Sequence, residues 1–137
     1  MIRLDDITLT FPDGESRLTA VDHVTLTVHP GTVTAITGPS GSGKSSLLAV
    51  AATLIRPDSG TVLIGDVDAT QLSPRDATNL RRDAIGIVFQ QSNLIPALTA
   101  REQLTVMNEL GKPHRRRNRA RVAARAHDLL AAVGLSA

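Results

Sequence analysis

A glycine- and serine-rich stretch at residues 38–46 carries the side chains best suited to chemistry. It reads Gly-Pro-Ser-Gly-Ser-Gly-Lys-Ser-Ser and fits the phosphate-binding pattern of a glycine, four residues, and then Gly-Lys-Ser/Thr. Glycines have no Cβ, so backbone N–H groups can approach phosphate oxygens and form an anion-binding nest. Lys44 is expected to reach the β- and γ-phosphates, and Ser45 to place its hydroxyl on Mg²⁺. The predicted ligand-binding residues are Gly38, Pro39, Ser40, Gly41, Ser42, Gly43, Lys44, Ser45 and Ser46.

The segments on either side give this stretch the setting that a phosphate site needs. Residues 32–37 are β-branched and apolar, which predicts a short buried strand. Residues 45–55 contain neither Gly nor Pro, which predicts a helix whose positive dipole end faces the phosphates. The alternative, a Gly/Ser-rich turn without a ligand, is disfavoured because a chance match is rare in so short a chain.

Composition excludes several other kinds of site. The 137 residues contain no Cys, which rules out a disulfide, a thiolate metal site and a cysteine nucleophile. Phe11 and Phe89 are the only aromatic residues, so the core must consist of Val, Leu, Ile and Ala. No apolar run is long enough to span a bilayer, and the N-terminus does not resemble a signal peptide. We therefore expect a soluble cytosolic chain, which could bind a membrane as a peripheral protein.

The pattern along the chain predicts an α/β fold. Alternating or β-rich runs predict four strands, at residues 2–11, 20–28, 61–64 and 85–89. The first two runs are spaced as in a hairpin, which predicts an antiparallel β layer. A Ser-Pro pair at Ser73 predicts a capped helix to about Asp83, and the capping box from Thr99 to Glu102 opens another. A further helix is predicted from His114 to Val133, with Gly134 just past its end, and residues such as Ala126 on its apolar stripe.

Several stretches, taken in order, resemble the ATP-binding cassette ATPases, the nucleotide-binding subunits of ABC transporters. Phe11 stands at the end of the first strand, where that family places an aromatic residue. The remaining matching stretches are residues 20–28, 57–65, the Q-loop-like run 85–91, and residues 92–102. The last of these is similar to the lipoprotein-release and macrolide-export subgroup.

This resemblance implies a P-loop NTPase core with an N-terminal antiparallel β layer and the beginning of a helical subdomain. Residues 1–90 would form the core and β layer, and residues 91–137 the start of the helical subdomain. The resemblance implies that Phe11 stacks on adenine and that Gln90 contacts Mg²⁺ and the attacking water. Lys44 and Gln90 would be its catalytic residues, Ser45 and Gln90 its metal contacts, and ATP with Mg²⁺ its ligands.

The resemblance also implies partners and a location. We expect a transmembrane permease subunit as partner, a homodimer in the full-length form, no nucleic acid, and a cytoplasmic position at the inner face of the plasma membrane. The expected function is to bind MgATP and thereby energise that permease.

The family's later motifs are absent from these residues: the signature loop, the Walker B strand and the switch histidine. The run Val62-Leu63-Ile64-Gly65-Asp66 only imitates Walker B, since a glycine interrupts it and no Glu follows. We therefore expect a chain truncated before those motifs, which cannot turn over ATP by itself. Two alternatives stay open: a non-catalytic truncated remnant, and a P-loop ATPase without a membrane partner.

One late segment is strongly basic. It has three interpretations: a solvated helix face, a contact with a membrane subunit or anionic lipid, or a phosphate contact with nucleic acid. No aromatic residues are interleaved for base stacking, which disfavours the last. Its cations are Lys112, Arg115, Arg116, Arg117, Arg119, Arg121 and Arg125. The four histidines are too scattered to predict a metal site.

Overall fold

The chain forms two compact units, Met1–Ile87 and Val88–Ala137. A computed structural model describes residues 1–109 and 119–135. From the sequence we expect a boundary after Gln90. The predicted start of the last helix at His114, and the part of the basic segment before Arg119, lie outside the described residues.

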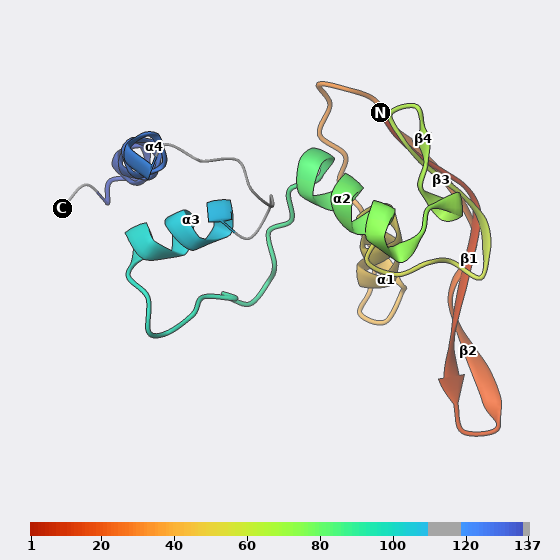
Figure 1. Ribbon diagram of the computed structural model, residues 1–137. Coiled ribbons are helices and arrows are strands. Elements are labelled where there is room, and N and C mark those ends of the chain that lie inside the picture. The colour runs from red at the N-terminus through yellow and green to blue at the C-terminus, as the bar shows by residue number, and fades with distance from the viewer. Residues whose placement is uncertain (110–118, 136–137) are drawn as a thin grey trace. The chain divides into compact units, whose positions relative to one another are not determined.

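A four-stranded sheet forms one side of the first unit (Figure 1). Its strands are β1 (Ile2–Asp13), β2 (Ser16–Val28), β3 (Ser59–Ile64) and β4 (Val67–Asp68), in the order β2-β1-β3-β4. Every neighbouring pair is antiparallel, and short turns join β1 to β2 and β3 to β4. The predicted antiparallel β layer is confirmed. The β1–β2 hairpin continues past Ser59, the first residue of β3, so its tip extends beyond the rest of the sheet (Figure 1).

Two helices and a short 3-10 turn complete the first unit. Helix α1 (Lys44–Ala51) follows the glycine-rich stretch, η1 (Ala69–Gln71) follows β4, and α2 (Pro74–Ala84) comes last. Ser73 caps α2 as predicted, because its Oγ accepts a hydrogen bond from the Asp76 N–H at 3.2 Å. The core is aliphatic, as the composition requires; its buried members are Leu4, Ile7, Leu9, Val21, Leu47, Val50, Val62 and Ile64.

Two predicted strands do not form. Residues 32–37 and 85–89 have no regular structure, and no strand in the described part of the chain pairs with them. The Val33 side chain is 100% exposed, whereas Ile36 packs against the core. A β-rich run needs a hydrogen-bonded neighbour to become a strand, and composition alone does not supply one. The prediction of buried strands at these positions is wrong for this structure.

The second unit contains two helices that pack against each other, α3 (Ala100–Glu109) and α4 (Arg119–Ala132). The predicted capping box is present: Thr99 Oγ1 accepts from the Glu102 N–H at 3.3 Å, and the Glu102 carboxylate accepts from the Thr99 N–H at 2.8 Å. Gly134, at φ +77°, follows the end of α4. Across the residues that the structure describes, no helix combines the length and apolar character needed to cross a membrane.

Candidate phosphate-binding site

The glycine-rich stretch forms a loop that leads directly into α1. Gly41 and Gly43 adopt φ values of +81° and +80°, a region that favours glycine. Gly43 is the N-cap residue of α1, and a Cβ added to it would lie 2.0 Å from the Ala20 carbonyl oxygen on β2. The loop is therefore seated on β2 by a contact that only glycine permits. This close contact between Gly43 and β2 fixes the direction in which the N-terminus of α1 points.

The backbone N–H groups at the start of α1 are suited to an anion. A helix leaves its first N–H groups without intrahelical acceptors, and the dipole makes this end positive. Gly43 has no side chain to satisfy them, and no acidic residue lies in the first turn of α1. The first intrahelical bond is donated by Leu47 to the Gly43 carbonyl at 2.8 Å. The arrangement can thus accept phosphate oxygens without displacing a capping side chain.

Lys44 folds back over the loop rather than pointing away from it. Its Nζ donates to the Pro39 carbonyl at 2.6 Å, the Gly38 carbonyl at 3.0 Å and the Ser42 hydroxyl at 3.3 Å. Three neutral acceptors therefore satisfy all three ammonium donors. The positive charge is held at the loop without a carboxylate partner in these bonds. A phosphate group entering the loop would replace neutral acceptors with charged ones, which form stronger hydrogen bonds.

A cavity of about 470 Å³ opens between the loop and β2. Its lining includes Gly38, Gly41, Lys44 and, on the strand side, Thr19 and Asp22. A volume of this size lies within the range of small-molecule sites, which is roughly 300–1,000 Å³. The sequence did not reveal that β2 would supply one wall, because that contact depends on where α1 packs.

The remaining predicted loop residues differ in exposure. Ser45 is exposed in the first turn of α1, while Ser46 is half-buried beside it. Ser40 is exposed in the loop. Within residues 1–109 and 119–135, no group of three or more His, Cys, Asp or Glu side chains could hold a metal ion. A Mg²⁺ ion here would take one hydroxyl from Ser45 and most of its ligands from phosphate and water, which is its common mode in nucleotide sites.

The two predicted residues outside the loop lie elsewhere in the chain. Phe11 is on the β1–β2 hairpin, opposite Leu18, and is 36% exposed. Phe11 does not line the 470 Å³ cavity. Gln90 belongs to the second unit, where its side chain is exposed in a segment without helix or strand. The structure therefore groups the loop residues 38–46 but does not bring Phe11 into their cavity.

Sequence reasoning missed a polar cluster at the base of the Phe11 hairpin. The Asp58 carboxylate accepts from the Thr10 N–H at 2.6 Å, the Thr10 hydroxyl at 2.8 Å and the Arg17 guanidinium at 3.3 Å. The hydrogen bonds from Thr10, and then the Arg17 charge, lower the pKa of Asp58 below its usual value. This cluster ties both strands of the hairpin to the turn before β3. The sequence signalled only a turn at Asp58, because its partners are distant in the chain.

Comparisons with known proteins bear on the family of the chain. A family model described as "ABC transporter" matches residues 21–137. An uncharacterized ABC transporter ATP-binding protein of Mycobacterium tuberculosis is 43% identical over 136 residues, which are 99% of this chain and 53% of that protein. The lipoprotein-releasing system ATP-binding protein LolD 1 of Rhodospirillum rubrum is 39% identical over 135 residues, 98% of this chain and 58% of that protein. The chain thus spans about half the length of the curated relatives it matches.

A solved structure gives the same result for the fold. It is the dimeric, post-hydrolysis state of the ATP-binding cassette MJ0796 bound to ADP and Pi, a protein of Methanocaldococcus jannaschii. The TM-score is 0.85 at 36% sequence identity, covering 96% of this chain and 56% of that chain. The expected α/β fold is confirmed by this likeness.

Proposed function

The chain belongs to the ABC transporter family, and from that premise we propose that it binds MgATP through residues 38–46. The observation that carries the proposal is the convergence of three features at one cavity. These are the glycine backbone seated on β2, the uncapped N-terminus of α1, and the Lys44 ammonium held over the loop. Each of them favours a polyphosphate over a neutral ligand.

Each loop residue then has a distinct role. Lys44 neutralises the terminal phosphates, whose oxygens replace the Gly38 and Pro39 carbonyls as acceptors for its ammonium group. The N–H groups at the start of α1 bind the inner phosphates. The Ser46 hydroxyl, in the first turn of the same helix, donates a further hydrogen bond to them. The Ser45 hydroxyl is the protein's ligand for Mg²⁺, which when bound would neutralise charge shared between the phosphates.

Two further residues complete the proposed site. Phe11 would stack on the adenine ring, since an aromatic side chain on a projecting hairpin is accessible to a flat ligand. Gln90 would contact Mg²⁺ and the attacking water, as the family resemblance implies. The second unit is proposed as the beginning of a helical subdomain, and the first as the nucleotide-binding core.

At the level of the cell, we propose that the chain serves as the ATP-binding part of a transporter. Its partner would be a transmembrane permease, its full-length form a homodimer, and its location the cytoplasmic face of the membrane. The lipoprotein-releasing relative of Rhodospirillum rubrum supports a release or export system. Lys44 and Gln90 would take part in ATP turnover only together with the carboxylates of a Walker B strand, a motif that residues 1–137 do not contain.

Nucleotide binding by this chain tests the proposal. The dissociation constant for a fluorescent ATP analogue with Mg²⁺ would be measured for wild type, Lys44→Ala and the control Arg82→Ala. Arg82 is a fitting control because it pairs with Asp83 on α2 and does not line the cavity. Loss of a charged hydrogen-bonding group should weaken binding by about tenfold or more. Equal affinity of wild type and Lys44→Ala, or no binding by folded wild type, would contradict the proposal.

A further inference from the structure

A second cavity lies in the first unit and shares no lining residue with the phosphate loop. Its volume is about 300 Å³, at the lower end of the range for ligand sites. The residues around it come from the end of α1 and the following turn, from β3, from η1 and from α2. The phosphate loop lies at the start of α1, whereas this second cavity is lined by residues at the end of α1 and just after it. The two cavities therefore involve opposite ends of the same helix.

The chemistry of this second cavity is unusual in one respect. Most of its wall is aliphatic, including the buried Val50 and Val62 and the exposed Leu54. Three threonines add hydroxyl groups, and two arginines add positive charge, yet no Asp or Glu lines it. A pocket with an apolar wall and uncompensated cations is complementary to a ligand that has an apolar tail and an anionic head.

Arg81 places one of these charges on the α2 side. Its Nη1 donates to the Thr53 carbonyl, just past the end of α1, and its Nη2 donates to the Thr78 hydroxyl at 2.8 Å. These bonds fix the half-buried guanidinium in place. A guanidinium has five N–H donors, so the bonds to Thr53 and Thr78 leave donors free for an anion. Arg81 therefore does more than stabilise the negative end of α1.

Arg56 supplies the second charge at the cavity. It follows α1 and is exposed at the cavity wall. Its guanidinium forms no hydrogen bond or ion pair with any residue that the structure describes. Two arginines, one held by hydrogen bonds and one without a partner among the described residues, can both donate to a carboxylate.

We propose that this second cavity binds a small amphipathic carboxylate, such as a medium-chain fatty acid. The alkyl chain would lie against Val50, Val62 and Ala77, and the carboxylate would bind Arg56 and Arg81. Burying the alkyl chain removes apolar surface from water, and the carboxylate sets the orientation. The proposal does not depend on nucleotide binding at the loop.

Sodium octanoate is the probe for this proposal. The full 137-residue chain would be titrated, and binding followed by calorimetry and by NMR shifts of the methyl groups of Thr53, Thr70 and Ala77. We expect saturable binding at one site. 1-Octanol should bind at least about tenfold more weakly because it lacks the charge, and inorganic phosphate alone should not shift these methyl groups.

Variants separate the site from non-specific association. Arg56→Gln and Arg81→Gln should each weaken octanoate binding by about tenfold, whereas the neighbouring Arg82→Gln should not. Ala77→Leu should block the cavity without changing charge. Because Arg81→Gln also removes the bond to Thr53, Arg56→Gln and Ala77→Leu, checked by circular dichroism, keep the test decisive. Absence of saturable octanoate binding, or equal binding by wild type, Arg56→Gln and Ala77→Leu, would overturn the proposal.

Discussion

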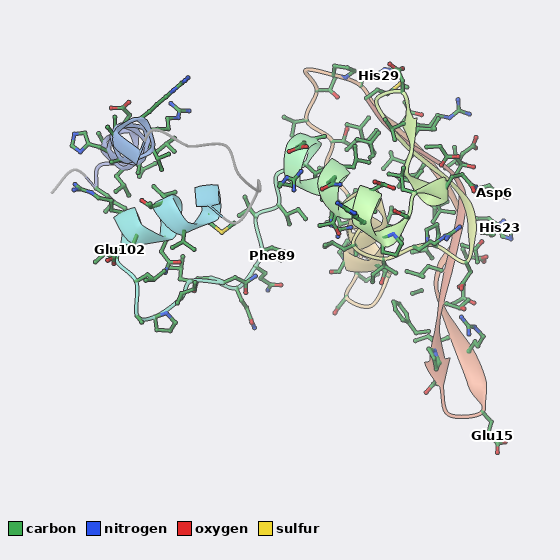
Figure 2. All side chains as sticks on the ribbon, in the orientation of Figure 1. Asp6, Glu15, His23, His29, Phe89 and Glu102 are labelled. Carbon is green, nitrogen blue, oxygen red and sulfur yellow. The ribbon has the colours of Figure 1, made fainter. Side chains whose placement is uncertain are left out.

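The His23 ring and the Asp6 carboxylate are joined across the first two strands, with 2.8 Å between Nδ1 and Oδ1. Both residues have left-handed backbones, with φ of +46° and +54°, next to shifts in the β1–β2 register. The Asp6 N–H donates to Thr25 Oγ1 at 3.0 Å, and the His23 N–H to Thr8 Oγ1 at 3.4 Å. Figure 2 shows the two side chains together at the same part of the sheet. The paired bulges thus bring the two side chains together.

This pair predicts a pH dependence of stability. The hydrogen bond that His23 donates to the Asp6 carboxylate, then the charges of Asp6 and Asp22, raise the pKa of His23 above 6.5. The native state therefore binds this proton more tightly, so its contribution is complete below pH 6.5 and is lost as pH rises through the raised pKa. Asp6→Asn should reduce that loss in a plot of Tm against pH, leaving the smaller part that comes from the Asp22 charge. Glu15→Gln, at the hairpin tip in Figure 2, should retain it; identical profiles for wild type and Asp6→Asn would count against the pair.

The Asp58 cluster predicts the opposite dependence at acid pH. Its pKa is lowered from 3.8, so its contribution is present above pH 3.8 and is lost as pH falls through the lowered value. Asp58→Asn should flatten the acid limb of stability and speed amide exchange at Thr10. Circular dichroism melts and hydrogen exchange, with Asp13→Asn as control, measure both effects. Unchanged exchange at Thr10 would show that the cluster does not hold the hairpin.

The seat of the phosphate loop predicts different effects for two glycine substitutions. Gly41→Ala meets no atom within 4 Å and should cost about 1–2 kcal/mol from its backbone conformation alone. Gly43→Ala places a Cβ 2.0 Å from the Ala20 carbonyl and should be more destabilising, and it should abolish binding of the ATP analogue. Urea unfolding and nucleotide titration give the comparison. Equal stability of the two variants would argue against the contact with β2.

The cap of α2 predicts a smaller loss. Ser73→Ala removes the acceptor for the Asp76 N–H and should lower the free energy of unfolding by about 1 kcal/mol. Ser92→Ala, at an exposed position in the second unit, is the matched control and should have little effect. Denaturant melts measure the difference. A Ser73→Ala protein as stable as Ser92→Ala would mean that the cap does not stabilise α2.

Local features of this protein were determined by the sequence alone. The glycine positions of residues 38–46, the Ser73 cap and the Thr99–Glu102 capping box all depend on neighbours a few residues apart. Their physics is contained in one short segment, so pattern is sufficient to predict them. The antiparallel β layer was also predictable, because short turns leave adjacent strands little choice of partner.

Only the tertiary structure decided the features that join distant segments. Residues 32–37 have a strand-like composition, but no described strand pairs with them, so they remain irregular. The contact of Gly43 with Ala20, the pairing of Asp6 with His23, and the placement of Arg56 and Arg81 around one cavity arise from packing and register. Such contacts join residues far apart in the chain, and no local pattern specifies which of many possible partners will meet.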